Sequence, residues 1–333
     1  MSGLSDFKRV LIFGGAGFIG RFMVEAFLRD TNAEVVVADI LTPVNFPKER
    51  VTSVIVDIRE PLKADFVEGE FDLVVNLAAI AKEPGYPNEH YYDVNAKGAL
   101  NILNFMRERG LKRLWFTSSM STYGPYEEPC SETSAQNPNT AYGGSKLLAE
   151  AHHHEWLKED EERVLIMCRP AVIFGPGENG NFTRLARALK KRRFVYPGRK
   201  DTIKANGYVG DLVASFFFMN GKTDRQVTYN FCYPQTYTIQ RIVEAFCSVW
   251  SLPKPPGSIP KPVVLFLAQL LKIANKTGLK GDIHPDRVMK VLRSTNIVPT
   301  VLLASGFEWP TKNLEGGLGE WIRRVPGGEF GES

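Results

Sequence analysis

Two side chains spaced for proton transfer stand in the middle of the sequence. Tyr142 and Lys146 are four residues apart, which places them one turn apart on the same face of a predicted helix. A phenol with a pKa of about 10 is a poor base at neutral pH, but a neighbouring ammonium group stabilises the phenolate and lowers that pKa. Ser119 follows a predicted strand and can hydrogen-bond a substrate oxygen that gains or loses a proton. These residues predict proton transfer at a hydroxyl-bearing carbon.

A glycine-rich stretch near the N-terminus predicts a dinucleotide site. The sequence GGAGFIG follows an apolar run directly and opens a helical pattern. In this position Gly14 permits a tight turn, Gly17 lets the backbone approach a pyrophosphate, and Gly20 lets helix and strand pack closely. The start of the helix, with Phe18 and Ile19, offers free N–H groups and a partial positive charge to the phosphates.

Asp39 indicates which dinucleotide is bound. It ends the next apolar run, about 20 residues past the glycines. A carboxylate there accepts hydrogen bonds from the ribose hydroxyls of adenosine and repels a 2′-phosphate. The residues that follow, ILTP, contain no arginine that could hold such a phosphate. The sequence therefore favours NAD over NADP.

The elements that position these residues follow a regular alternation. Apolar strands are predicted at 9–13, 34–38, 52–56, 73–77, 113–117 and 163–168, and helices at 18–29, 96–109 and 142–159. Such alternation predicts a parallel sheet covered by helices on both faces. We expect an α/β fold with a Rossmann doubly wound parallel sheet over residues 1–175, with strands returning from about 203–230.

After Pro170, proline and glycine become frequent, and helices are predicted at 182–191, 239–250 and 262–275. We expect residues 176–333 to form mainly a smaller C-terminal α/β domain that binds substrate.

Composition and charge exclude several classes of protein. The 333 residues carry a net charge of +4, and their four cysteines have no metal or redox spacing, which indicates reduced thiols and a cytoplasmic location. The first residues lack an apolar signal core, and no apolar run approaches about 18 residues, so neither secretion nor a membrane span is expected. Residues 263–274 are the nearest candidate; a core or lid helix is favoured there over an interfacial membrane helix.

Two local clusters need a separate interpretation. Positive residues gather at Lys190, Lys191, Arg192 and Arg193, and again at Arg199, Lys200 and Lys204. Such runs are usually solvated faces, and they attract an anionic substrate only where they border a site. Three consecutive histidines at 152–154 point about 100° apart on a helix and have no partner at helical spacing, so no metal site is predicted.

The motifs taken in order resemble those of extended short-chain dehydrogenases/reductases, and specifically the NAD-dependent epimerase/dehydratase branch that acts on nucleotide sugars. Beside the residues above, the shared motifs are Asp57-Ile58, Asn76-Leu77-Ala78-Ala79, Asn95, Ser118-Ser119, Tyr123-Gly124, Tyr142 with Lys146, Arg169-Pro170 and Phe174-Gly175-Pro176-Gly177. The resemblance covers nearly the whole chain. It is specific for the branch and much less so for the substrate.

The resemblance implies a set of cofactor contacts. Asp57 and Ile58 would contact adenine, Asn95 would support the adenosine side, and Lys146 would also hold the nicotinamide ribose. The remaining cofactor contacts that it implies are Leu77, Ala78, Ala79, Ser118 and Tyr142.

On the substrate side, Asn181 and Phe182 resemble a pair that grips the nucleotide diphosphate, although an asparagine there also suits a helix N-cap. Lys204 stands where the family commonly has arginine and would meet a phosphate only as a point charge. Dehydratases carry Asp-Glu after the catalytic Ser or Thr, where this chain has Met120 and Ser121. Neither residue can do acid–base work, which argues against dehydration.

These observations predict an NAD-dependent nucleotide-sugar epimerase, acting at C4 through a transient 4-keto intermediate. The alternative is an NAD(P)H-dependent reductase of a nucleotide 4-keto-sugar, because the same three residues serve both reactions. A non-catalytic dinucleotide-sensing regulator is disfavoured, because it needs no proton relay. The resemblance also implies a homodimer, in which the helix that starts near Asn95 and the helix that carries Tyr142 pair with their twofold mates.

Overall fold

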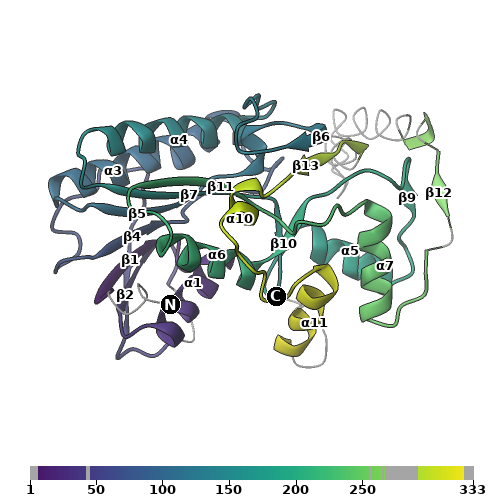
Figure 1. Cartoon of the computed structure of the whole chain (residues 1–333), viewed down its shortest axis with the longest axis horizontal. Helices are drawn as coiled ribbons and strands as arrows, with labels where there is room; N and C mark the ends of the chain where they lie inside the picture. The colour runs from purple at the N-terminus through teal and green to yellow at the C-terminus, as the bar shows by residue number, and fades with distance from the viewer. Residues whose placement is uncertain are drawn as a thin grey trace.

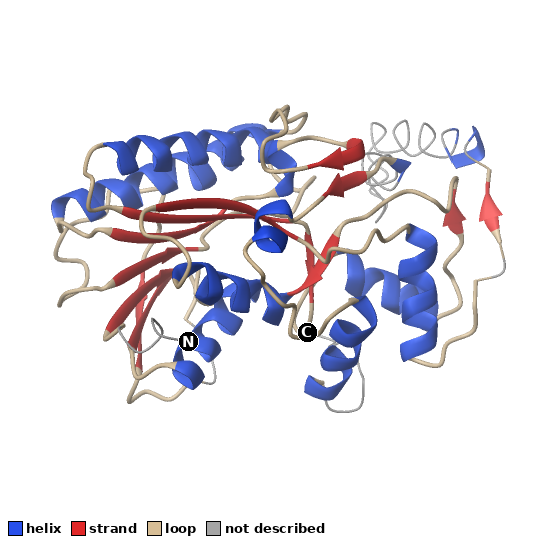
Figure 2. Ribbon diagram, in the orientation of Figure 1, coloured by secondary structure: helices blue, strands red, loops and turns tan. Residues whose placement is uncertain are grey.

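A seven-stranded parallel sheet forms the centre of the first half of the chain (Figures 1 and 2). The computed structural model describes residues 7–42, 46–255, 257–260, 262–264, 266 and 292–325. The strands of the sheet are β1 (Arg9–Phe13), β2 (Glu34–Asp39), β3 (Val51–Ile55), β4 (Leu73–Asn76), β5 (Arg113–Thr117), β7 (Val164–Pro170) and β11 (Gln226–Phe231). Their order is β11-β7-β5-β4-β1-β2-β3, and all neighbours are parallel.

The strand order identifies where a ligand is expected. It reverses between β1 and β4, and in doubly wound sheets the crevice at such a reversal, outside the carboxyl ends of the strands, binds dinucleotides. The predicted Rossmann sheet is confirmed.

Helices cover both faces of the sheet, as Figure 1 shows. α1 (Phe18–Asp30) and α6 (Val209–Asn220) pack on one face, and α3 (Gly98–Glu108) and α4 (Ala141–Lys158) pack on the other. The alternation of side chains along β1 divides the core accordingly: Val10 and Ile12 belong to one buried apolar cluster, and Leu11 and Phe13 to the other. Each strand is thus buried on both faces, which explains its continuous apolar sequence.

The predicted helix at 96–109 begins earlier than expected. α2 (Asn88–Tyr92) runs through a wider, π-helical turn at Asp93–Lys97 into α3. Such wide turns are frequent at functional sites, and this one contains Asn95.

Most of the rest of the chain lies in the right half of Figure 1. It contains three small parallel sheets of two strands each. The paired strands are β8 (Val172–Phe174) with β10 (Asn206–Tyr208), β9 (Tyr196–Pro197) with β12 (Ser258–Ile259), and β6 (Tyr126–Cys130) with β13 (Thr295–Ile297). The helices are α5 (Asn181–Lys190), α7 (Ile239–Val249), α10 (Thr300–Ala304) and α11 (Leu314–Arg324).

The apolar core continues from the main sheet into this second region through buried aromatic residues, including Phe174, Phe182, Phe246 and Trp321. β11 returns to the main sheet, whereas most of the later elements do not. The division into residues 1–175 and 176–333 stays a prediction. The helix predicted at 262–275 and the candidate interfacial segment at 263–274 lie largely outside the described residues.

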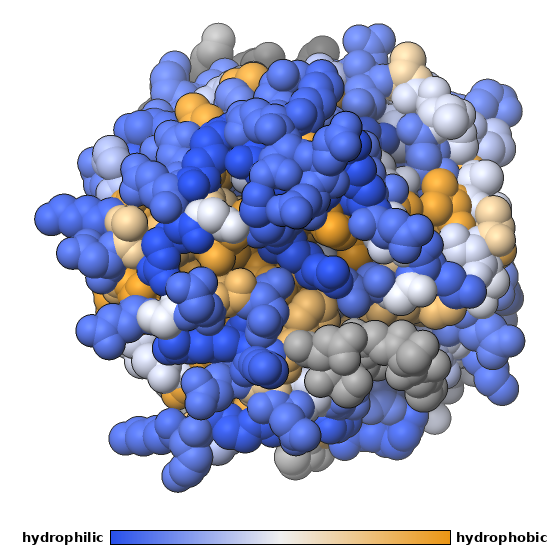
Figure 3. Space-filling model, turned by 60° about the vertical axis from the view of Figure 1, so that its left-hand side comes forward, coloured by the Kyte–Doolittle hydropathy of each residue, from blue (hydrophilic) through white to orange (hydrophobic). Residues whose placement is uncertain are grey.

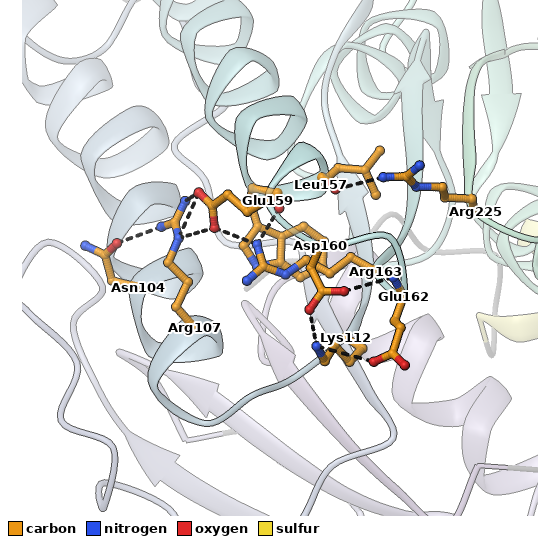
Figure 4. A network of polar contacts seen from close by, with 10 residues as sticks. Asn104, Arg107, Lys112, Leu157, Glu159, Asp160, Glu162, Arg163 and Arg225 are labelled. Atoms are coloured by element: carbon orange, nitrogen blue, oxygen red, sulfur yellow. Dashed lines mark hydrogen bonds and ion pairs between the residues drawn. The ribbon is translucent and has the colours of Figure 1, made fainter.

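An exposed polar network closes the amino-terminal edge of the sheet (Figure 4). Glu159, just after α4, accepts hydrogen bonds from Arg107 of α3 at 2.7 and 2.9 Å and from Arg163, before β7, at 2.6 Å. Lys112, before β5, pairs with Asp160. The network therefore lies at the end of α4 remote from Tyr142.

The face shown in Figure 3 is mostly hydrophilic, with hydrophobic residues reaching the surface in a band across its middle. Within the described part of the chain, none of the helices has the length and apolar character needed to cross a bilayer.

Candidate active site

The glycine-rich turn forms as the sequence predicts. Gly14 has a φ of 78° and donates its N–H to the carbonyl of Ala38 at 3.0 Å. A Cβ on Gly14 would lie 2.6 Å from the Ala78 nitrogen, and a Cβ on Gly20 would lie 2.3 Å from the Gly14 oxygen. Only glycine fits at these two positions, because the turn brings the start of α1 against the carboxyl ends of β1 and β4.

Asp39 ends β2 beside this turn. Its carboxylate accepts hydrogen bonds from the N–H of Ala16 at 3.0 Å and of Leu41 at 3.1 Å. Two buried atoms near the same edge, Asn76 Oδ1 and Thr117 Oγ1, have no hydrogen-bond partner among the described residues. A buried polar atom without a hydrogen-bond partner destabilises the fold, and a polar ligand at this edge of the sheet would supply such partners. The glycine turn, the carboxylate and these two atoms fit a dinucleotide.

The other residues expected near the cofactor differ in exposure. Asp57, after β3, is half-buried and pairs with Arg59. The side chain of Ile58 is buried and packs against Gly98 of α3. Little of its surface is therefore exposed for a contact with adenine. After β4, Leu77 and Ala78 are half-buried and Ala79 is exposed, along the crevice edge.

Asn95 is a clamp within the protein. Its Oδ1 accepts from the N–H of Ile80 at 2.8 Å, and its Nδ2 donates to the Ile80 carbonyl at 3.2 Å and to Ser145 Oγ at 3.0 Å. The side chain is buried. These hydrogen bonds join the loop after β4 to α4. Asn95 would therefore affect adenosine binding only indirectly, by holding that loop in place.

α4 begins with Tyr142 in its first turn and Lys146 one turn further on. Thr140 caps the helix by accepting from the N–H of Gly143 at 3.1 Å. A Cβ on Gly143 would lie 2.3 Å from the carbonyl oxygen of Ser121. Glycine at this position therefore lets the first turn of α4 approach the short turn that follows Ser119.

Ser119 and Tyr142 come together at this approach. Interaction with the Ser119 hydroxyl lowers the pKa of Tyr142, although burial, the larger effect, and the nearby Glu83 carboxylate raise it. Tyr142 also donates its backbone N–H to Glu83 Oε1 at 3.3 Å. The sequence predicts that Lys146 lowers the pKa of Tyr142, but the net direction here is upward. The Lys146 ammonium lies 4.5 Å from the centre of the Phe116 ring, so it is engaged by that ring face.

Lys146 is buried, and its surroundings shift its pKa. Burial lowers the pKa of Lys146 to about 7, and the carboxylate of Glu150, one turn further along α4, opposes that effect. His153, the next buried residue on this face, stacks on Phe116 with ring centres 3.8 Å apart, and burial lowers its pKa to about 3. The predicted absence of a metal at the three histidines stays a prediction.

Glu150 is the centre of a buried network that the sequence interpretation missed. It accepts from Arg169 Nε at 2.9 Å and Nη2 at 2.7 Å, from Gln136 Nε2 at 2.9 Å, and from the Ser118 hydroxyl. Arg169 also donates to the Tyr123 hydroxyl at 2.7 Å. The network joins α4 to the carboxyl ends of β5 and β7. The available signal was the spacing of Glu150, four residues after Lys146.

The three residues expected on the substrate side in addition to Ser119 are placed differently from one another. Gly180, not Asn181, caps α5; Asn181 is exposed in the first turn and accepts from Arg184 at 2.8 Å. The alternative of an asparagine N-cap is therefore wrong. Phe182 is buried and stacks on Phe174 with centres 4.6 Å apart, so its side chain belongs to the core. Lys204 Nζ donates to the carbonyl of Arg293 at 2.5 Å.

Three comparisons relate this chain to known proteins. N-acetyl-alpha-D-glucosaminyl-diphospho-ditrans,octacis-undecaprenol 4-epimerase of Escherichia coli O157:H7 is 30% identical over 311 residues, covering 90% of this chain and 90% of that protein. UDP-glucose 4-epimerase of Streptococcus mutans is 35% identical over 150 residues, covering 42% of this chain and 45% of that protein, so this match spans less than half of either. The structure of Thermus thermophilus UDP-glucose 4-epimerase in complex with NAD shares the fold, with a TM-score of 0.71 and 23% identity over 96% of this chain and 99% of that one.

A model of the NAD dependent epimerase/dehydratase family matches residues 10–232. That span includes the glycine turn, Asp39, Ser119, Tyr142 and Lys146. The near end-to-end similarity to the Escherichia coli relative agrees with it. The chain belongs to the NAD-dependent epimerase/dehydratase family, and NAD is its cofactor.

Proposed function

We propose that this protein is a 4-epimerase of a sugar carried on a diphosphate, with nucleotide sugars as its water-soluble substrates. The observation that carries the proposal is the match along 90% of both chains to a 4-epimerase. That relative is named for a sugar on undecaprenyl diphosphate, and the Streptococcus mutans relative for UDP-glucose. A sugar joined to a diphosphate is common to both names.

The residues at the crevice can carry out the proton transfers that such a reaction needs. As phenolate, Tyr142 removes the proton from the C4 hydroxyl, while Ser119 hydrogen-bonds the same oxygen. Bound NAD would supply the acceptor for the C4 hydride and the donor that returns it. After the 4-keto sugar has turned its other face, Tyr142 gives the proton back to the C4 oxygen. The overall reaction is redox-neutral.

Lys146 and the cofactor residues have supporting parts in this proposal. Lys146 is the buried cation one turn from Tyr142 on α4, and its ammonium form would stabilise the phenolate against the burial that raises the pKa of Tyr142. Gly14, Gly17 and Gly20 would hold the pyrophosphate, and Asp39 would hold the adenosine ribose. Loss of a hydroxyl is disfavoured because Met120 and Ser121 offer no acid beside Ser119.

The cofactor requirement separates epimerase from reductase. Purified enzyme given UDP-N-acetylglucosamine or UDP-glucose should form the C4 epimer with a catalytic amount of NAD⁺ and no lasting change in absorbance at 340 nm. Stoichiometric loss of NADH with a 4-keto-sugar, and no epimer formation, would favour the reductase.

We also propose a cytoplasmic homodimer. Leu148 is exposed on the outer surface of α4. Tyr92, at the end of α2 and shortly before α3 in the sequence, is exposed as well. An isologous four-helix contact of α3 and α4 with their twofold mates would cover such groups. Sedimentation at micromolar concentration should give a dimer, and a monomer alone would refute this part.

A further inference from the structure

The segment that leads through α5 into β9 carries an unusual excess of positive charge. Between residues 179 and 200 the sequence has eight lysines and arginines and no aspartate or glutamate. We call residues 184–200 the basic segment. Its positive side chains are Arg184, Arg187, Lys190, Lys191, Arg192, Arg193, Arg199 and Lys200.

The charge is concentrated where α5 ends. Lys190, Lys191, Arg192 and Arg193 are consecutive and exposed. None of the four forms an ion pair with a carboxylate of the described residues, whereas Arg199 of the same segment pairs with Glu127 and Asp201. Surface arginines elsewhere in the chain are commonly compensated: Arg107 pairs with Glu159, and Arg324 with Glu25. An uncompensated cluster of four cations attracts polyanionic surfaces.

Exposed apolar side chains occur at both ends of the pair formed by β9 and β12. Val195, two residues after Arg193, is 38% exposed, and Val263 and Phe266 after β12 are 44% and 60% exposed. The two strands are parallel, and the N–H of Gly198 donates to the carbonyl of Ile259 at 2.8 Å, so Val263 and Phe266 follow the end of the pair from which Arg199 and Lys200 also leave. Figure 1 shows this pair of strands at the right edge, away from the main sheet.

The basic segment also adjoins the expected substrate side of the site. α5 runs from Asn181, a candidate diphosphate contact, to Lys190, and at a rise of ~1.5 Å per residue the two ends lie roughly 14 Å apart. After β9 the chain passes Arg199 and reaches Lys204, the second candidate phosphate contact, within five residues. Each end of the segment is therefore joined along the chain to a candidate phosphate contact.

We propose that the basic segment docks on an anionic lipid bilayer and so presents the site to a sugar diphosphate anchored in that membrane by a lipid chain. Cations flanked by exposed apolar side chains match an anionic headgroup layer, where both kinds of group are stabilised. A freely diffusing nucleotide sugar needs no such surface, whereas a lipid-anchored substrate stays in the membrane. The substrate part rests on the proposed function, but the docking part does not.

Docking is tested with the full-length protein and vesicles. Wild type should co-float with vesicles of phosphatidylcholine and phosphatidylglycerol but not with phosphatidylcholine alone, and high salt should release it. The variant with Lys190→Gln, Lys191→Gln, Arg192→Gln and Arg193→Gln should bind more than a hundredfold more weakly, because each cation near an anionic surface contributes roughly fivefold.

A matched control removes four exposed lysines elsewhere, through Lys8→Gln, Lys63→Gln, Lys222→Gln and Lys312→Gln. It lowers the net charge equally and should keep most of the binding. Failure of wild type to bind anionic vesicles, or equal binding by the two quadruple variants, would overturn the docking proposal.

Activity distinguishes the substrate part from the proposed function. On a saturating concentration of a UDP-sugar in solution, where capture of the anionic substrate no longer limits the rate, the basic-segment variant should keep the wild-type kcat. On a polyprenyl diphosphate sugar in anionic vesicles, it should lose most of its rate. If wild type epimerises only the UDP-sugar, the lipid-anchored substrate is refuted while the proposed function stands. If it epimerises neither, the proposed function fails, and vesicle binding still decides the docking.

Discussion

We call the part of α4 from Tyr142 to Glu150 its first end and the part around Glu159 its far end; the two hold similar ions in opposite surroundings. In the first, Glu150 and Arg169 form an ion pair whose side chains are 2% and 7% exposed, one turn from Lys146. At the far end, Glu159 is 41% exposed and pairs with Arg107 and Arg163 (Figure 4). The first end contains Tyr142, and the far end lies at the opposite edge of the sheet.

The difference lies in what each pair contributes to stability. An exposed pair contributes about 0–1 kcal/mol to stability, because water already solvates both ions. A buried pair does not stabilise a fold more than apolar residues of the same shape, but loss of one partner costs about 3–5 kcal/mol. The buried ions near Tyr142 are therefore not explained by stability alone. Their position sets the charge and the geometry around Lys146.

The largest expected effect is at the first end, on turnover. Tyr142→Phe should lower kcat by about 10²- to 10⁴-fold, because the group that exchanges the proton is lost. NAD binding should stay close to wild type, since the glycine turn and Asp39 are untouched. Lys146→Met should impair both turnover and NAD binding. Steady-state rates and cofactor titration measure the two properties, and a Tyr142→Phe enzyme with more than a tenth of wild-type rate would show that the proton relay is misassigned.

Next in size is the effect of the buried pair on folding. Glu150→Ala should lower the free energy of unfolding by about 3–5 kcal/mol, because Arg169 is left as a buried charge without its partner. Replacing both, as Glu150→Leu with Arg169→Met, should recover much of the loss. Denaturant unfolding of the three proteins tests this, and a loss below about 1 kcal/mol for Glu150→Ala would mean that the pair behaves like a surface pair.

A smaller effect is expected on the pH dependence of turnover. The pKa of Lys146 is lowered by burial to about 7, and Glu150 opposes that lowering. Activity that requires the ammonium form is present below this pKa and is lost as the pH rises through it. Removing the negative charge in Glu150→Gln lowers the pKa of Lys146 further, so the alkaline loss of kcat should move to lower pH. An unchanged profile would argue that Glu150 has only a structural role.

The smallest effect is expected at the far end. Glu159→Gln should change the free energy of unfolding at neutral pH by less than about 1 kcal/mol, since the pair is solvated. Arg107 and Arg163 lower the pKa of Glu159 to about 2, so this contribution is present above the ordinary carboxyl pKa and is lost as the pH falls toward 2. A loss as large as that of Glu150→Ala would remove the contrast between the two ends.

Features that depend on neighbouring residues in the sequence could be predicted from it. The strands, the glycine turn, Asp39 and the spacing of Tyr142 and Lys146 are local patterns, and the fold and family that they predict are confirmed. α6 was not predicted, because its run of three phenylalanines is apolar on every side and carries no helical period. The roles of individual site residues stay predictions.

Partners remote in sequence could not be read from such patterns. Glu150 meets Arg169 across two elements, and Asn95 meets Ile80 and Ser145. The spacing of Lys146 alone predicts a lowered pKa for Tyr142, but burial raises that pKa, and the Ser119 hydroxyl, which lowers it, only partly offsets this effect. Tertiary packing determines these contacts, and local sequence does not encode it.

The most direct test of the proposed 4-epimerase is the fate of the hydrogen at C4. A UDP-sugar with deuterium at C4 should give an epimer that keeps the deuterium at C4, because the hydride that leaves is the one that returns. NMR and mass spectrometry of the product, with NAD⁺ in catalytic amount, measure this. Epimerisation at C4 with loss of the deuterium to solvent, or inversion at another carbon, would contradict the account.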